Sequence, residues 1–369
     1  MKKTIAVMLC LLLLFINGGC NIVNSKNAEP AQLNGEVQED TSKPETVPEK
    51  DDFNGEFSLA PSNSSVISTD TPVVMGNTVY FNQKHMGGEN DGVYAYDPEN
   101  KQKCIAKAST LLGGNENGFF ALRENQLSFY EGERVVAMVS LNGTPELIYC
   151  GVWNDIAYFQ DVAAQETKLI TWDYRQKEEP KVVALPREFA ADWAFIGNTA
   201  YLWRESVASD LELFALDLDT LECKYLENLS KGGKAVLHAS DDMLYIGTDQ
   251  ELYSYADGKL TTLNITEGAR YSFYQNSVYI TDLETKVTQS LDLKTLQPTD
   301  EIGEGQTLVA CTKRGILLRE GDRLIWPQGG KEAEFKGLLS PNGYAVSDSF
   351  VAVTSSSSNV IGIQLYPWK

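Results

Sequence analysis

The sequence contains little of the material from which most enzyme active sites are built. Its 369 residues include only two histidines, His85 and His238, so a catalytic triad, a histidine general base or a His-based zinc site has few possible members. Positive charge is also scarce, because 31 Lys and Arg stand against 51 Asp and Glu, a formal net charge of −20. This excess of negative charge excludes nucleic acid as a partner, since the phosphate backbone repels it.

Paired cysteine spacing is missing too. The six cysteines include no Cys-x-x-Cys motif, so the sequence predicts neither a metal site nor a cofactor. We expect Cys104, Cys150, Cys223 and Cys311 to be free and buried as small apolar residues. A disulfide would need Cα atoms within about 7 Å, which residues on non-adjacent repeats do not reach. Acidic residues are so numerous that an acid–base pair is easy to imagine, and no catalytic residue is assigned.

No apolar run at the N-terminus is long enough to span a membrane. Thr4 to Ile16 is a thirteen-residue apolar stretch that follows Lys2 and Lys3, which predicts an export signal over residues 1–20. Its end, Asn17-Gly18-Gly19-Cys20, resembles the bacterial lipoprotein signal, although Asn17 stands where that pattern usually has Leu. The resemblance implies a diacylglyceryl group on Cys20 and a lipoprotein at the extracytoplasmic face of the cell membrane. An ordinary secretory signal is the alternative.

Aromatic residues are absent from residues 21–52, which consist mainly of Asn, Glu, Gln, Lys, Ser, Thr and Pro. Such a segment buries too little apolar surface to offset its ordering entropy, so we expect residues 21–54 to be a disordered tether. Residues 55–369 should form one domain. Residues 1–20 hold two lysines and residues 21–60 hold three lysines against nine acidic residues, which leaves −16 on residues 61–369.

A repeated sequence motif, which we call the repeated phrase, is present along this domain and predicts its fold. The first half is a polar turn followed by an alternating apolar strand, as in Gly76-Asn77-Thr78-Val79-Tyr80-Phe81. Asn, Asp and Gly suit the positive φ angles of tight hairpin turns. The repeats recur every 34 to 44 residues, a period typical of propellers and solenoids. Their aligned ring positions are Tyr80, Phe120, Tyr158, Tyr201, Tyr245, Tyr279, Leu317 and Val351.

The second half of the phrase is another alternating strand, as in Val93-Tyr94-Ala95-Tyr96-Asp97, and a shorter strand flanks each pair on either side. Four short antiparallel strands per repeat, without helical stretches, predict an all-β fold: a β-propeller of four-stranded antiparallel blades. We count eight blades, with seven as the alternative. The last repeat, Gly343 to Tyr366, supplies three strands, so we expect its fourth from Gly55–Ala60.

Two segments, Tyr279-Ile280-Thr281-Asp282 and Tyr94-Ala95-Tyr96-Asp97, resemble the motif of YWTD-type propellers, such as those of low-density-lipoprotein-receptor proteins. The resemblance covers repeats one to six and extends to uncharacterised bacterial relatives, although Trp is missing from the second position of the motif. It implies binding or scaffolding and supplies no catalytic residues. The signatures of sialidase, quinone-dependent dehydrogenase, WD40 and kelch repeats are absent from the sequence.

Ligand contacts are expected on the face that carries the loops between second and third strands and between blades, because loops vary on a rigid frame. The candidate binding residues are His85, Asp91, Asp192, Trp193, Trp203, Arg204 and Arg270. Asp192, Trp193 and Arg270 should lie nearest the axis, and Trp203-Arg204-Glu205 is the favoured contact. The alternatives are that His85 is simply solvated, that Trp203 packs between blades and that His238 is a hydrogen-bonded core residue.

The expected function is therefore a non-enzymatic, lipid-anchored, monomeric propeller that binds an unidentified protein or glycan partner outside the cytoplasm. Two alternatives remain open. One is a cell-surface glycan-active enzyme with two carboxylates about 5–10 Å apart in the propeller channel. The other is an envelope assembly scaffold similar to BamB, which would require a Gram-negative envelope.

Overall fold

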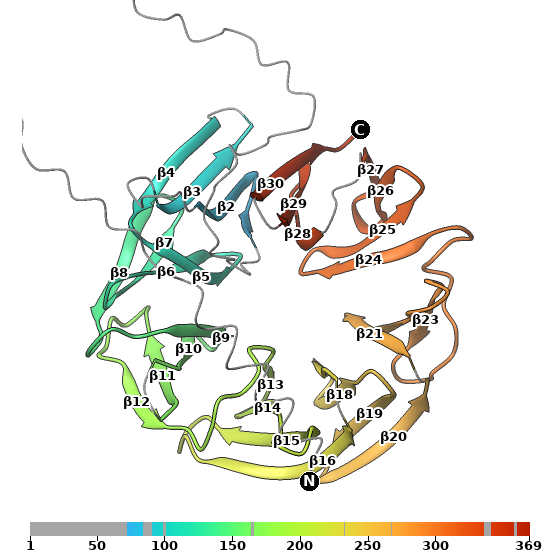
Figure 1. The fold of residues 1–369 in the computed structure, drawn as a ribbon, viewed down its shortest axis with the longest axis horizontal. Coiled ribbons are helices and arrows are strands. Elements are labelled where there is room, and N and C mark those ends of the chain that lie inside the picture. Colours follow the sequence, from blue (N-terminus) through green and yellow to red (C-terminus); the bar gives the residue numbers. More distant parts are fainter. Residues whose placement is uncertain are drawn as a thin grey trace, which may run out of the picture. The chain divides into compact units, whose positions relative to one another are not determined.

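The computed structural model describes residues 72–83, 91–98, 101–163, 166–231, 233–266, 268–335, 341–357 and 360–369. Over these residues the chain forms eight antiparallel sheets arranged as the blades of a ring, which we name A to H in chain order (Figure 1). The single helical element in this part of the chain is a 3₁₀ turn, η1 (Pro327–Gly329). The prediction of an eight-bladed all-β propeller is confirmed, and the seven-blade alternative is wrong.

Blades A to D each contain four strands in sequential order. Blade A has β1 (Val73–Met75), β2 (Thr78–Gln83), β3 (Gly92–Asp97) and β4 (Lys101–Lys107). Blade B has β5 (Thr110–Asn115), β6 (Gly118–Arg123), β7 (Gln126–Glu131) and β8 (Arg134–Ser140). Blade C has β9 (Leu147–Trp153), β10 (Ile156–Asp161), β11 (Lys168–Asp173) and β12 (Lys181–Ala184). Blade D has β13 (Ala194–Ile196), β14 (Thr199–Glu205), β15 (Asp210–Asp217) and β16 (Cys223–Lys231).

Blades E and G repeat this arrangement, whereas F and H have three named strands each. Blade E has β17 (Val236–Ser240), β18 (Met243–Gly247), β19 (Glu251–Ala256) and β20 (Lys259–Ile265). Blade F has β21 (Ala269–Tyr274), β22 (Ser277–Asp282) and β23 (Thr288–Asp292). Blade G has β24 (Thr307–Thr312), β25 (Gly315–Glu320), β26 (Arg323–Trp326) and β27 (Lys331–Glu334). Blade H has β28 (Pro341–Val346), β29 (Phe350–Ser357) and β30 (Val360–Pro367).

The three-stranded blades differ from the expected four strands. In blade F an isolated bridge between Leu291 and Pro298 stands where a fourth strand would pair with β23. Pro has no N–H to donate to a ladder, which accounts for the lack of a continuous strand there. The segment expected to complete blade H, Gly55–Ala60, lies outside the described residues.

The repeated phrase forms the first hairpin of each blade, as expected. Asn154 and Asp155 have φ angles of 49° and 62° in the turn before β10, and Asp241 and Asp242 have 48° and 61° before β18. Positive φ at both central residues is the geometry that matches the twist of paired strands. The eight ring positions lie on the second strands, and all are buried except the half-buried Tyr201.

Neighbouring blades pack face to face, and the packing closes the ring. Phe120 of blade B lies against Phe159 and Trp172 of blade C, at ring centroid distances of 5.3 and 6.3 Å. Val79 of blade A shares an apolar cluster with Leu365 of blade H, which joins the last blade to the first. Both faces of most sheets are thus covered, which explains the continuous apolar character of the second strands.

Glycines on first strands allow adjacent blades to approach closely. A Cβ atom on Gly113 of β5 would overlap the ring of Tyr149 on β9, and one on Gly151 of β9 would overlap the ring of Phe195 on β13. Each aromatic ring thus lies against the glycine of the preceding blade. The glycines are required here for space between backbone and ring.

The outer strands contain a recurrent irregularity. A one-residue β-bulge falls at Ile105 in β4, Val136 in β8, Leu226 in β16 and Leu263 in β20. Each bulged residue is apolar and packs against a core cluster. Bulges bend an edge strand and interrupt its row of hydrogen-bonding groups, so they protect the rim of the propeller from pairing with other chains.

Two amide side chains fasten the connections beside the second strands. Asn82 of β2 accepts a hydrogen bond from Leu111 N at 2.6 Å and donates one to Leu111 O at 2.9 Å. Gln160 of β10 does the same with Phe189, at 2.8 Å to its N and 2.9 Å to its O. Both amides lie two residues after a ring position, so the repeat places the same pair of side-chain hydrogen bonds in blades A and C.

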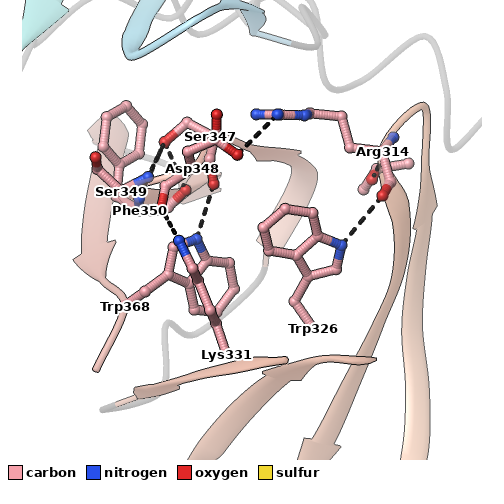
Figure 2. A network of polar contacts seen from close by, with 9 residues as sticks. Arg314, Trp326, Lys331, Ser347, Asp348, Ser349, Phe350 and Trp368 are labelled. Atoms are coloured by element: carbon pink, nitrogen blue, oxygen red, sulfur yellow. Dashed lines mark hydrogen bonds and ion pairs between the residues drawn. The ribbon is translucent and has the colours of Figure 1, made fainter. Parts of the chain in front are cut away.

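The C-terminus fastens blade H to blade G (Figure 2). The Trp368 ring stacks on Trp326 at 5.8 Å and its N–H donates to Ser347 O at 2.8 Å. Arg314 pairs with Asp348 at 2.8 Å, and Lys331 donates to the Asp348 carbonyl. These contacts join turns of two blades, so the last residues of the chain contribute to closing the ring.

The four cysteines among the described residues are free thiols, as expected: Cys150 is buried, and Cys223 and Cys311 are half-buried. The expectation of burial is wrong for Cys104, which is exposed on the outer strand β4. Outer strands have one face on the core and one on solvent, so an alternating strand there presents every second residue to water. Among the described residues there is also no helix with the length and apolar character needed to cross a membrane.

Candidate functional site

The strand order gives the ring two faces, which carry different kinds of connection between strands. The loop face carries the connections between second and third strands and the connections between blades, and the turn face carries the hairpin turns between first and second strands. First strands such as β5, β9, β13 and β21 lie nearest the centre of the ring, and β4, β8, β12 and β16 lie at its rim (Figure 1). Residues next to the start of a first strand are therefore on the loop face near the axis.

Asp192 occupies such a position, immediately before the β13 region of blade D. Its carboxylate accepts a hydrogen bond from Leu237 N of β17 at 3.2 Å, so it reaches across to blade E. The residue is exposed to solvent, yet surrounding protein displaces enough water to raise the pKa of the carboxyl to about 6, against the smaller opposing effect of the Leu237 bond. A solvent-accessible carboxylate that is held in place and half-neutralised near pH 6 is suited to bind a hydrogen-bonding or cationic group.

Arg270 and Trp193 are the other residues expected near the axis. Arg270 lies on β21, the first strand of blade F, and is exposed on the loop-face half of that strand. Trp193 is buried: its indole N–H donates to Ala190 O at 2.9 Å, and its ring packs near Tyr158 at 6.3 Å. Arg270 is therefore placed to meet a ligand, whereas the position of Trp193 favours a packing role.

Trp203 and Arg204, the favoured contact, are engaged with the protein itself. Trp203 belongs to the apolar cluster between blades D and E, the alternative stated for it above. Arg204 forms an ion pair with Glu212 and lies over the ring of Phe214 at 5.3 Å. These contacts favour a structural role for both side chains.

The remaining candidates are one loop residue and one residue at its border. His85 lies outside the described residues. Asp91 lies just before β3, half-exposed, and its carbonyl accepts the N–H of Ala108 at 2.7 Å. His238, expected to be a hydrogen-bonded core residue, is half-buried; its Nε2 lies 2.7 Å from Gln275 O and its ring stacks on Phe273 at 5.1 Å. Burial lowers the pKa of His238, against the smaller opposing effect of its hydrogen bond to Gln275.

The turn face contains a contact across the ring. Lys313, in the turn between β24 and β25, donates to Gly114 O of β5 at 2.8 Å, although blades G and B are not neighbours. Surrounding protein lowers the pKa of Lys313, and Glu116 partly offsets this. The two blades are thus tied together at the turn-face end of the axis. Sequence reasoning missed this contact, since Lys313 is an ordinary turn residue by composition.

Apolar side chains on the loop face are the second feature that sequence reasoning missed. Val207, Ile265, Leu283 and Val287 are 94, 67, 36 and 57 % exposed. All four lie on the loop face of the consecutive blades D, E and F, in the β14–β15 loop, at the end of β20 and in the β22–β23 loop. We name these four residues the apolar tips. In the sequence, an apolar residue within an otherwise polar loop was the signal that could have indicated these exposed side chains.

Metal chemistry finds no support in the described residues, since no group of three or more His, Cys, Asp or Glu in this part of the chain could hold an ion. The carboxylates of Asp217, Asp282 and Asp292 have lowered pKa values because each accepts hydrogen bonds from its own turn. They serve to cap turns. The loop face therefore offers Asp192, Arg270 and the apolar tips for recognition.

No family model matches the chain, and no curated protein matches it. Solved structures are similar in fold. A prolyl endopeptidase structure is 10% identical, with a TM-score of 0.46, and the match covers 77% of this chain and 52% of that one. The AfRom2 CNH domain is 12% identical over 85% and 97% of the two chains, with a TM-score of 0.43. TolB from Acinetobacter baumannii is 10% identical over 78% and 79%, with a TM-score of 0.37.

This chain spans about half the length of the prolyl endopeptidase chain that it matches. At these identities and TM-scores the likenesses support no inference about what the protein does.

Proposed function

We propose that this protein is a non-enzymatic binding module, anchored by a lipidated Cys20 outside the cytoplasm, which recognises a partner with its loop face. The observation that carries the proposal is the placement of Asp192: an exposed carboxylate beside the axis, held by Leu237 N of the next blade and with its pKa raised to about 6. Preorganised polar groups on rigid strands reduce the entropy cost of binding. The closed ring of blades supplies that rigidity.

Anchoring is tested by fractionation of cells that make the full chain. With Cys20 lipidated, the protein should carry radiolabelled palmitate and sediment with membranes, and Cys20→Ala should release it into the soluble extracytoplasmic fraction. A label that survives the Cys20→Ala substitution, or an unmodified wild-type protein, would show that Cys20 is not the anchor. Two acyl chains are needed for stable attachment, so partial sedimentation would also count against it.

Recognition by the loop face is tested in the same cells with a photo-crosslinking amino acid. We expect a discrete adduct when it replaces Arg270 and none when it replaces Lys294, an exposed residue of the turn face. Adducts at neither position, or at both equally, would contradict a loop-face binding module.

A glycan-active enzyme is the second candidate, and one observation favours it: a carboxyl with a pKa near 6 is suited to general acid catalysis. Such an enzyme needs a second carboxylate at a defined distance. Turnover of cell-surface polysaccharides by the purified domain, lost in Asp192→Asn, would support the enzyme and overturn the binding module.

A further inference from the structure

The β22–β23 loop carries Leu283 in a sequence motif that occurs three times, and the leucine of the motif differs in burial each time. The same turn is formed by three segments, and in each the Asp carboxylate accepts the N–H groups of the residues two and three positions later: Asp217-Leu218-Asp219-Thr220, Asp282-Leu283-Glu284-Thr285 and Asp292-Leu293-Lys294-Thr295. In each the Leu N–H donates to a neighbouring backbone carbonyl, at 2.8 to 3.0 Å. Leu293 is buried and Leu218 half-buried, but Leu283, on the loop face, is exposed.

Three of the apolar tips are neighbours through the backbone. Leu283 N donates to Gly268 O at 2.9 Å, which places the β22–β23 loop against the blade E to F connection that begins after Ile265. Val287 O accepts Asp282 N at 2.9 Å and closes the same loop. Leu283 and Val287 thus lie on one loop that is closed by a hydrogen bond and held against the connection that follows Ile265.

Val207, in the β14–β15 loop on the loop face of blade D, also lies in a loop that is held by hydrogen bonds. The Ser206 hydroxyl accepts the N–H groups of Ala208 at 3.2 Å and Asp210 at 3.1 Å, and Ser209 N donates to Ser206 O at 3.0 Å. The loop is therefore fixed by its own hydrogen bonds while its tip is almost fully exposed. Binding through such a tip loses little conformational entropy.

Charge around the apolar tips selects the kind of partner. Exposed carboxylates of Glu205, Asp249 and Glu284 lie on the same face, and residues 61–369 carry −16 in total. A second copy of the domain would bring the same charge, and anionic lipid headgroups would repel it. A protein whose own surface is basic around an apolar centre is attracted. Arg270 and Lys286 are the opposing cations of blade F on this face.

We propose that the loop face of blades D, E and F docks a folded protein partner that presents basic side chains around an apolar centre, with Val207, Ile265, Leu283 and Val287 inserted into that centre. This proposal specifies the partner for the proposed binding function and rests on that function.

The test places the photo-crosslinking amino acid at Val287 of the full chain, in cells, and compares the adduct with that formed from Met138. Met138 and Val135 are matched controls, because they are 56 and 44 % exposed but lie on the outer strand β8. We expect one discrete adduct at Val287 and none at Met138. The captured protein, identified by mass spectrometry, should have a basic surface. Its yield should fall at least tenfold between 0.15 and 0.5 M NaCl in lysed membranes.

Substitutions then distinguish this docking surface from the proposed binding function in general. Ile265→Glu and Leu283→Glu, each in the chain that carries the crosslinker at Val287, should lower the adduct at least tenfold, and Val135→Glu should leave it unchanged; circular dichroism confirms folding of each. An adduct from Arg270 but not from Val287 would overturn the docking surface and leave the binding function standing. An adduct of two copies of this chain, or with an acidic protein, would also overturn it.

Discussion

Replacement of Gln160 by Leu should destabilise the propeller strongly. Gln160 is completely buried, and its amide satisfies both the N–H and the C=O of Phe189, at 2.8 and 2.9 Å. Leucine has a similar volume, so little packing is lost, but both backbone groups of Phe189 are left unpaired in a buried site. Each unpaired group costs about 1–3 kcal/mol, so we expect a loss of about 2–6 kcal/mol in the free energy of unfolding.

The assay is urea unfolding of residues 55–369, followed by far-ultraviolet circular dichroism and by tryptophan fluorescence, so that the two-state assumption is checked by coincidence of both probes. Gln176→Leu is the matched control, because Gln176 is exposed in a turn, and its effect should remain within about 0.5 kcal/mol. A loss below about 1 kcal/mol for Gln160→Leu would refute the reasoning, since it would mean that Phe189 finds other partners.

A second variant, Gln160→Glu, tests the hydrogen bond that the Gln160 amide donates to Phe189 O, separately from the bond that it accepts. An ionised carboxylate can accept from Phe189 N but cannot donate to Phe189 O, and its burial raises its pKa in the folded state. Only the protonated form restores the donor, so the variant should gain stability relative to wild type as the pH falls from 7 to 5. An identical pH dependence of the two proteins would exclude this account.

Two further predictions concern Asp192 and the C-terminus. The raised pKa of Asp192 means that the folded protein holds this proton more tightly than the unfolded chain, so its contribution to stability is present below about pH 4 and is lost as the pH rises through 6. The stability of Asp192→Asn relative to wild type should therefore increase as the pH rises from 4 to 6. The increase should be less than about 1 kcal/mol, because the group is exposed. Free energies of unfolding that change in parallel for the two proteins across this range would contradict the prediction. Trp368→Ala removes the ring stack on Trp326 and the hydrogen bond to Ser347 O, so it should lower the free energy of unfolding in urea by about 2 kcal/mol. Trp368→Phe should cost about half as much. No loss in Trp368→Ala would show that blades G and H pack together without Trp368.

The candidate site was predictable only in outline. Asp192 and Arg270 could be placed near the axis because their distance from a ring position fixes where they fall in the blade. The roles of Trp203 and Arg204 could not, because an aromatic and a charge at a strand end look alike whether they face a ligand or a neighbouring blade. The packing of Trp203 between blades D and E, and the pairing of Arg204 with Glu212, depend on which side of β14 each residue faces and on what the next blade presents there.

Local periodicity determined the architecture of this protein by itself. Turn residues that tolerate positive φ, followed by strands that alternate every second residue, act over short distances. The eight hairpins, and the ring positions that are buried in all but one of them, therefore follow from the sequence. Contacts between segments far apart were decided only in three dimensions. Examples are the tie from Lys313 to Gly114, the clamp of Gln160 on Phe189, and the exposure of Leu283 in a motif that buries Leu293. The physical reason is that burial and desolvation depend on which blade lies opposite, and the spacing of residues in one repeat carries no information about that.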